Sequence, residues 1–493
     1  MVVSLLLAVP AAVGLWLVTG GRGLHVDTAR ALTAAAAGLT LALAVMVSVA
    51  PLEVDRPWLP ELGVRWSFGA DGIAVPLVLL TAVVGLLVAV HAWVEVPQGG
   101  TPAAFLGCLL LVEAGALATF TARDAVLFFV AFELVLVPMW VLISRYGDRH
   151  DDRARVDAGH RFILYTAVGS TLMLVGILAL VTSAGTSDLR ALAGGAGAAL
   201  PPDRQLLVAA LLVTGLAVKV PVFPFHTWLP PAHTIAPTAG SVLLAAILLK
   251  MGTYGLVRLP VATVPDGFGR LSPVLAVLGV VGIVWGALVC LVERDLKRLI
   301  AYSSVAHMGF VVLALAAGSQ TGLQAALFAN VAHGVVSALL FVLVGGLKQR
   351  WGSVDLAVAR PALRETSPRL GFVLVLGLAA SLGLPGLAGF WGELLALFSA
   401  WQPAADRPRA LFMGCAVVAA VGAALAAAYA LRVARAVWVG DRPDPDVTTT
   451  PDTRGVELAV LAALSFAVVA LGVVPGPLLA VTADTVASIV GAP

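Results

Sequence analysis

The chain has 493 residues, of which 60% are hydrophobic and 12% are charged, and its mean hydropathy is +1.00. A water-soluble domain cannot bury that much apolar surface, so the composition excludes one and predicts a polytopic membrane protein. The net charge of +2 is too small to indicate a nucleic-acid partner, and the three cysteines, without a CxxC pair, support neither an iron–sulfur cluster nor a structural zinc.

Long, unbroken apolar runs predict an all-α integral membrane protein with about fourteen transmembrane helices. The first run, "MVVSLLLAVPAAVGLWLVTG", lacks the basic start of a signal peptide, so we expect it to remain as the first span. The spans are centred near residues 11, 40, 82, 111, 134, 172, 214, 247, 281, 307, 334, 383, 421 and 469.

Basic residues predict the orientation of these spans. The connections after odd-numbered spans hold 19 of the 30 lysines and arginines, and those after even-numbered spans hold 9. The positive-inside rule therefore places the odd connections in the cytoplasm and both termini on the outer side. The two cations that remain, Lys219 and Lys250, fall within spans, and they are half of the four lysines in the chain. A desolvated lysine can release a proton, whereas arginine stays charged, so this distribution indicates proton-carrying chemistry.

In chain order, the ionisable residues predicted within spans are Glu113, Glu133, Lys219, Lys250 and Glu393. A charge at the centre of a spanning helix costs about 2.5–3.5 kcal/mol on insertion scales, so each group needs a protein partner or a hydrated path. The alternative for Glu133 and Lys219 is a static interhelical ion pair, and the alternative for Glu113 is a position at the headgroups.

Histidines add groups that exchange protons near neutral pH. His307, in "SSVAHMGFVV", and His333, in "ANVAHGVVSALLF", lie on neighbouring predicted spans, beside small residues that permit close helix approach. We expect both to act as proton relays, although a lone membrane histidine is often only a packing group. His226, near Lys219, is expected to lie at the end of a broken span.

Prolines predict breaks in two spans. Pro221 and Pro224 follow Lys219 and cannot donate backbone N–H groups, and Pro385 precedes Glu393 in "SLGLPGLAGFWGE". The breaks lie five spans apart, so they have opposite orientations, which is typical of inverted repeats in transporters. The predicted units are three N-terminal spans (1–98), a five-helix repeat (99–260), a second, inverted five-helix repeat (261–440), and a connection with the final span (441–493).

Four motifs resemble those of the antiporter-like proton-pumping subunits of respiratory complex I (NADH–quinone oxidoreductase) over roughly residues 100 to 400. They are "FELVLVPMW", "VKVPVFPFHTWLPPAHTIAPTAGSVLLAAILLK" (218–250), "ERDLKRLIAYSSVAHMGFVV" (293–312) and "LPGLAGFWGE". The resemblance implies a proton path through the membrane. In it, Glu133 would be the acid beside Lys219, Lys250 the central carrier, His307 and His333 the relays, Glu393 the terminal residue, and Glu113 an auxiliary acid.

Within the family, glutamate at Glu393 resembles the M-type subunit, since the L and N types and the Mrp-type antiporters usually carry lysine there. Residues 439–455 lead only into one last span, without the long lateral helix of the L type. The resemblance implies no cofactor in this chain, with NADH, FMN, iron–sulfur clusters and quinone in partner subunits. It also implies L- and N-type neighbours and a bacterial plasma membrane. An Mrp-type cation/proton antiporter subunit and a membrane-bound hydrogenase subunit remain alternatives, as does a purely structural spacer.

Overall fold

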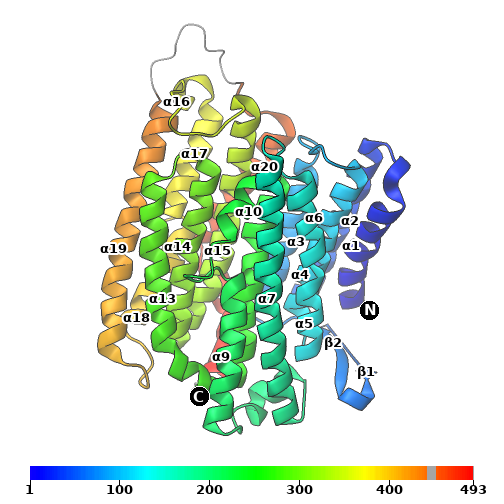
Figure 1. The fold of residues 1–493 in the computed structure, drawn as a ribbon, viewed down its shortest axis with the longest axis vertical. Coiled ribbons are helices and arrows are strands. Elements are labelled where there is room, and N and C mark those ends of the chain that lie inside the picture. The colour runs from blue at the N-terminus through cyan, green and yellow to red at the C-terminus, as the bar shows by residue number, and fades with distance from the viewer. Residues whose placement is uncertain (51, 441–450, 492–493) are drawn as a thin grey trace.

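The computed structural model describes residues 1–50, 52–440 and 451–491. In this part of the chain the helices stand side by side with their axes nearly parallel (Figure 1). Eleven of them are long and apolar enough to cross a membrane, by length and composition, and three shorter apolar helices accompany them. Helices are expected because a backbone in lipid must satisfy its hydrogen bonds within its own segment. The predicted helical membrane fold is confirmed, whereas the count of fourteen spans and the two repeats stay predictions.

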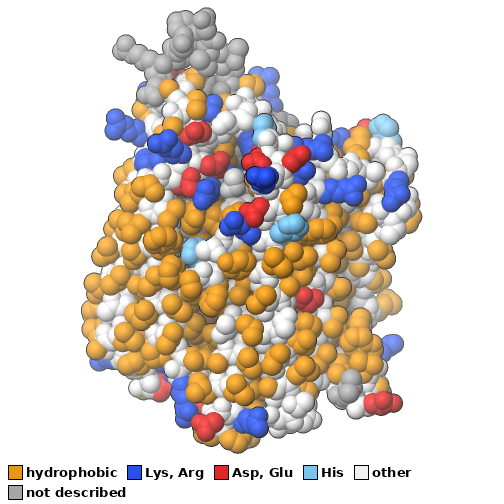
Figure 2. All heavy atoms as spheres, viewed as in Figure 1, with side chains coloured by type: hydrophobic (Ala, Val, Ile, Leu, Met, Phe, Trp, Pro, Cys, Tyr) orange, Lys and Arg blue, Asp and Glu red, His pale blue; other side chains and the backbone are white. Residues whose placement is uncertain are grey.

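The molecule has an apolar belt between two polar ends (Figure 2). Lysines and arginines gather mainly at the upper end in this view, where the connections that sequence analysis assigned to the cytoplasm lie. Both chain ends lie in the lower half of Figure 1. The segment Thr238–Val261 and the helices Leu296–Ala316 and Gln320–Trp351 are almost wholly buried. Their polar side chains therefore face protein rather than lipid.

The N-terminal part holds three helices and a hairpin. A short 3-10 turn, η1 (Gly21–Gly23), joins the first two helices, and η2 (Pro60–Leu62) lies at the tip of the hairpin. The elements are α1 (Val2–Thr19), α2 (Val26–Val49), β1 (Glu53–Leu59), β2 (Val64–Gly69) and α3 (Val75–His91).

The hairpin of β1 and β2 was not predicted from the sequence. The strands pair antiparallel from Glu53 opposite Gly69 onward. Gly63 has a φ of +67°, a left-handed conformation that glycine adopts without strain, so it closes the turn. An edge-to-face contact between Trp58 and Trp66, at 5.6 Å, ties the two strands together.

The middle part contains the first predicted break. Its helices are α4 (Pro102–Thr121), α5 (Ala125–Leu134), α6 (Leu136–Tyr146), α7 (Asp152–Ala184), α8 (Leu189–Ala191), α9 (Pro202–Lys219), α10 (Leu229–Ile235), α11 (Thr238–Leu243) and α12 (Leu249–Leu256), with π-turns η3 (Leu192–Ala196), η4 (Leu244–Leu248) and η5 (Val257–Val261). The interruption between α9 and α10 confirms the break that Pro221 and Pro224 predicted. The interruption between α5 and α6 was not predicted. It precedes Pro138, which leaves a carbonyl one turn earlier without its N–H donor.

The second predicted break lies farther along the chain. The helices are α13 (Pro265–Val292), α14 (Leu296–Ala316), α15 (Gln320–Trp351), α16 (Leu363–Thr366), α17 (Pro368–Ser381), α18 (Ala388–Trp401), α19 (Arg409–Val433), α20 (Gly455–Val473) and α21 (Gly476–Val490), with π-turn η6 (Ala434–Val439). The gap between α17 and α18 confirms the break around Pro385. The stretch 441–450 lies outside the described residues. Beyond it stand two helices, α20 and α21, rather than one, because Pro475 and Pro477 end the first and begin the second.

Candidate functional site

Lys250 lies at the centre of the molecule and is fully buried. It follows the π-turn η4, and its Nζ atom donates a hydrogen bond of 2.8 Å to the carbonyl of Ala245, five residues earlier. π-turns inside helices leave backbone groups free for such contacts and are frequent at functional sites. The local irregularity therefore gives the lysine a partner that a regular helix would not offer.

His333 lies directly beside Lys250. The Lys250 Nζ atom is 2.5 Å from His333 Nδ1. Gly334 permits this approach of α15 to the π-turn, because a Cβ there would lie 3.1 Å from the Ala246 carbonyl and 2.7 Å from Leu80 Cδ2. One of the two facing nitrogens must lack a proton on the line between them, so the pair shares a proton.

Two further sequence-predicted residues continue this arrangement. The rings of His333 and His307 lie 5.5 Å apart, between centroids. His307 Nδ1 lies 3.0 Å from Glu393 Oε1, and His307 Nε2 lies 2.9 Å from Ser381 Oγ. Ser381 ends α17 and Glu393 begins the second turn of α18, so the break between these helices places both groups at the histidine.

A small cavity of about 30 Å³ is shared by His307, His333, Ser381 and Glu393. That volume is enough for a water molecule, and the lining offers several polar partners. Four of the seven predicted site residues thus form one polar line, in which Lys250 and His333 are buried and His307 and Glu393 are partly buried. We refer to these four residues as the central line.

Lys219 and Glu133 form a second group. Lys219 is the last residue of α9, is 3% exposed, and lies with Nζ 5.0 Å from the ring centre of Phe132 and 5.9 Å from that of Phe162. Lys219 and the Ser170 hydroxyl are the polar groups that act on the Glu133 carboxylate. Within the described residues, no ion pair of 4.0 Å or less joins Glu133 to Lys219. The two groups attract each other across a gap, which differs from a closed static pair.

Glu113 stands apart from both groups. It is 1% exposed on α4, so it does not face the headgroups. Its carboxylate packs against α3, where a Cβ at Gly85 would lie 2.5 Å from Oε1. Among the described residues, Oε1 has no hydrogen-bond partner. No described contact joins Glu113 to the central line.

Four of the five charged residues predicted within spans lie at an irregularity of their helix, whereas Glu113 lies within the regular helix α4. Glu133 immediately precedes the interruption between α5 and α6, and Lys219 ends α9. Lys250 follows η4, and Glu393 follows the break before α18. Irregular backbone is tolerated at membrane depth where it is buried in protein or lines a hydrated path, and these four positions lie at such irregularities.

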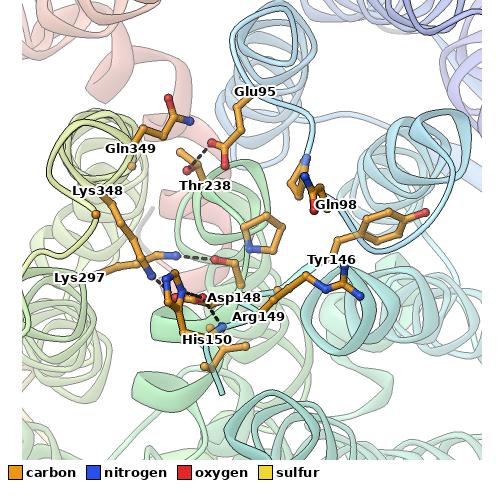
Figure 3. A pocket seen from close by; sticks show the side chains of 17 residues that line it. Glu95, Gln98, Tyr146, Asp148, Arg149, His150, Thr238, Lys297, Lys348 and Gln349 are labelled. Atoms are coloured by element: carbon orange, nitrogen blue, oxygen red, sulfur yellow. Dashed lines mark hydrogen bonds and ion pairs between the residues drawn. The ribbon is translucent and has the colours of Figure 1, made fainter. Parts of the chain in front are cut away.

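A polar hollow of about 340 Å³ opens at the end of the helices where α6, α10 and α15 meet (Figure 3). Lys348 pairs with Asp148, and His150 Nδ1 lies 2.6 Å from Asp148 Oδ1. On the other side, Thr238 donates to Glu95 at 3.0 Å. Burial alone would raise the pKa of Asp148, but the hydrogen bonds from Lys348 and His150 outweigh it and hold the pKa below its usual range.

Two buried groups, one lining this hollow and one near it, were missed by sequence analysis. Lys297 was assigned to a cytoplasmic connection, yet it is 4% exposed and its Nζ donates to the carbonyl of Ala236. His233 was not considered, yet it is fully buried, with its ring stacked on Phe341 at 4.6 Å. Among the described residues, neither of its ring nitrogens has a hydrogen-bond partner.

His233 lies within electrostatic reach of Lys297, Lys250 and His333. Because Lys297 lines the hollow and the other two belong to the central line, His233 lies near both. The signal for it was present in "FHTWLPPAH", which places a second histidine on the helix after the first break.

The opposite end of the Lys250 segment carries a fixed charge. Arg258 forms an ion pair with Asp71, and its Nε donates to the Tyr254 hydroxyl at 2.9 Å. Tyr254 in turn donates to the Phe120 carbonyl at 2.7 Å. Because arginine keeps its proton, this ion pair does not serve as a proton relay.

Residues 122–419 match the family model described as "NADH:quinone oxidoreductase/Mrp antiporter, TM". The chain is 39% identical over 421 residues to NAD(P)H-quinone oxidoreductase chain 4 1 of Synechococcus sp. (strain JA-3-3Ab), covering 85% of this chain and 78% of that one. It is 37% identical over 432 residues to NADH-quinone oxidoreductase subunit M of Rhodobacter capsulatus, covering 85% and 81%. Its fold is similar to a chain in the structure of respiratory complex I from Thermus thermophilus with bound NADH, with a TM-score of 0.86, 30% identity, and coverage of 99% and 100%.

Proposed function

Because this chain belongs to the NADH:quinone oxidoreductase/Mrp antiporter transmembrane family, we propose that it is a membrane-arm subunit of an NADH–quinone oxidoreductase and carries protons across the membrane. The observation that carries this proposal is the central line, Lys250–His333–His307–Glu393. Buried ionisable groups at membrane depth are costly, and a continuous line of them is typical of proton relays. In this proposal, quinone reduction elsewhere in the complex drives protons along the central line.

The chain's own residues provide each transfer. Lys250 in its charged form donates from Nζ toward His333 Nδ1, which leaves a neutral amine on the lysine. The imidazole of His333 passes a proton across the shared cavity to His307. His307 then exchanges a proton with the carboxylate of Glu393, 3.0 Å away. Two imidazoles suit the middle of this route, because a neutral imidazole has one nitrogen that accepts a proton and another that donates one.

Protons reach Lys250 from the polar hollow in this proposal. Lys297 and His233 are the groups that lie between the hollow and Lys250. Both are buried, so a proton that passes them is shielded from lipid and from bulk water. The hollow lies at the end of the molecule rich in basic residues, which the positive-inside rule assigns to the cytoplasm.

Glu133 and Lys219 control the transfer electrostatically. Because the two groups attract each other without contact, a perturbation from a neighbouring subunit can change their separation. In a low-dielectric interior such a change shifts the proton affinity of groups on the packed helices by several kcal/mol. Moving one charge against 100 mV needs about 2.3 kcal/mol, so the coupling has a sufficient scale.

The proposal includes the setting of the chain. It has L- and N-type neighbours, no redox centre of its own, and NADH, FMN, iron–sulfur clusters and quinone in other subunits. It lies in a bacterial plasma membrane with both termini on the outer side. The breaks after Lys219 and before Glu393 support two inverted five-helix repeats, 99–260 and 261–440, each of which supplies part of the path.

Lys250→Arg tests the proposal, because arginine keeps the charge but does not release the proton. We expect a loss of proton pumping of at least tenfold in membrane vesicles, measured by the quenching of a ΔpH dye, with the assembled complex present. Arg270→Lys, which exchanges one exposed cation for another, serves as the control. Full pumping by the Lys250→Arg complex would exclude Lys250 as a carrier.

The alternative function is cation/proton exchange without a redox partner, which the family description also covers. Glu393, where Mrp-type proteins usually carry lysine, argues against it. Two observations separate the functions, namely which subunits co-purify with the chain and whether a sodium gradient drives proton movement in the absence of NADH. The main proposal predicts that flavin- and cluster-containing subunits co-purify with the chain. A membrane-bound hydrogenase would differ from it in the electron donor.

A further inference from the structure

A groove of about 510 Å³ lies between α1, α4 and α6, away from the central line. Its floor is formed by one face of α4. The residues on this face recur every three or four positions, and they are Thr101 at the N-cap, Ala104, Cys108 and Leu111. The side chains of Ala104 and Cys108 are small, so they leave space above this face of α4. Val18 of α1 and the residues Val137 and Val141 of α6 form its walls.

Close helix packing on either side fixes this shape. A Cβ at Gly107 would lie 2.6 Å from the Gly14 carbonyl, so α1 is held directly against α4. A Cβ at Gly115 would lie 2.7 Å from Val135 Cγ1, so the α5–α6 junction also touches α4. The groove is the space that remains over α4 between these two contacts, and it is part of the rigid packing.

Two arginines stand at the polar mouth of the groove. Arg22 follows α1 and Arg145 lies in the last turn of α6, and both side chains are exposed. The Nε atom of Arg145 donates to the Gly99 carbonyl at 3.0 Å, which holds its terminal nitrogens in place. In the part of the chain that the structure describes, no acid forms an ion pair within 4.0 Å of either arginine. The groove thus combines two unneutralised cations with an apolar channel.

The dimensions match one leaflet of a bilayer. From Thr101 to Leu111 the helix rises about 15 Å, which is half of a hydrocarbon core of about 30 Å. Thr101, Tyr146 and the two arginines lie at the end of α4 and α6 that the positive-inside rule assigns to the cytoplasm. An occupant therefore needs an anionic head at this level and an acyl chain that reaches toward mid-membrane.

We propose that this groove binds an anionic phospholipid of the cytoplasmic leaflet, with its phosphate between Arg22 and Arg145 and one acyl chain along Ala104, Cys108 and Val141. A zwitterionic lipid carries a cationic group beside its phosphate and so brings no net negative charge to the two arginines, which makes it bind less well. Basic pockets between transmembrane helices on this side of a membrane are known to suit such headgroups. The groove would thus hold a lipid as a fixed part of the wall between α1 and α6.

Photolabelling of the purified complex tests the proposal. The complex is exposed to phosphatidylglycerol with a photoreactive acyl chain, or to phosphatidylcholine with the same chain. We expect phosphatidylglycerol to label the peptides that contain Ala104–Leu111 and Val137–Val141 several-fold more strongly. Each of Arg22→Gln and Arg145→Gln should reduce this labelling about fivefold, since a cation near the surface contributes about that factor.

Two variants complete the design. Ala104→Phe fills the floor without removing a charge and should abolish the labelling. Arg153→Gln, which replaces an exposed arginine in the first turn of α7, should leave the labelling unchanged. Quinone reductase activity reports that each complex is assembled. Equal labelling by the two lipids, or labelling that survives the loss of both arginines, would overturn the proposal. So would cross-linking of Val141→Cys to a neighbouring subunit's helix, since that helix would then occupy the groove.

Discussion

The Nζ atom of Lys250 and the Nδ1 atom of His333 lie 2.5 Å apart, although 82 residues separate them along the chain. Neither residue has another charged partner within that distance among the described contacts. The contact exists because η4 turns the lysine toward α15 and because Gly334 lets α15 come close. It is the junction between the two halves of the predicted path.

Replacement of His333 by alanine should stop proton transfer at this junction. We expect at least a tenfold loss of NADH-driven pumping, because Lys250 loses the only described side chain that accepts its proton at hydrogen-bond distance. The measurement is the ratio of ΔpH formation to NADH oxidation in membrane vesicles. His160→Ala, at an exposed site on α7, is the control and should keep the wild-type ratio.

Glu133→Ala should impair both pumping and quinone reduction. The change removes the acid that attracts Lys219 across the gap. A perturbation from a neighbouring subunit then has no Glu133–Lys219 distance to change. Glu133→Asp keeps the charge and should retain part of the activity, and Glu61→Ala, at the exposed tip of the hairpin, should retain all of it. If Glu133→Ala vesicles pump and reduce quinone normally, Glu133 has no part in coupling.

We expect the contribution of the Asp148–Lys348 pair to stability to stay constant near neutral pH. Since the pKa of Asp148 lies below its usual range, its contribution to stability is present above the unfolded pKa and is lost only as pH falls through the lower folded value. Between pH 5 and 8, approximately, the carboxylate stays ionised. Asp148→Asn should therefore lower the melting temperature of the complex by a similar small amount, about a few degrees, at both ends of this window. A difference that disappears at about pH 5 would mean that the native carboxylate has already been protonated there.

Glu457→Gln should loosen the last part of the chain. Glu457 on α20 and Arg350 on α15 form two hydrogen bonds, of 2.8 and 2.6 Å, and their side chains are 7% and 14% exposed. Breaking a buried pair leaves an uncompensated charge, which costs about 3–5 kcal/mol. We expect less of the chain in the assembled complex on native gels. The matched control, Glu365→Gln, breaks an exposed pair with Arg364 and should have no effect.

Local chemistry was sufficient to predict the helical membrane fold and both broken spans, because prolines and apolar runs act within one segment. It also singled out Lys250, His307, His333 and Glu393, since a charge or imidazole in an apolar run is conspicuous. Which of them touch depends on helix rotation, and that is set by close packing at glycines far away in the chain. Lys297 was assigned to the wrong environment because it stands among other charged residues in "ERDLKR", where only tertiary packing decides which side chain turns inward.

The Arg258–Asp71 pair has a consequence for the direction of transport. It lies eight residues from Lys250 on the same segment, about 12 Å farther along. An arginine that is paired with a carboxylate does not release its proton, so this pair does not relay protons at that end of the segment. Under the proposed function, a proton held on Lys250 has no straight way out along its own segment. It has to move along the central line, in the plane of the membrane. This lateral route prevents protons from leaking straight back across the membrane.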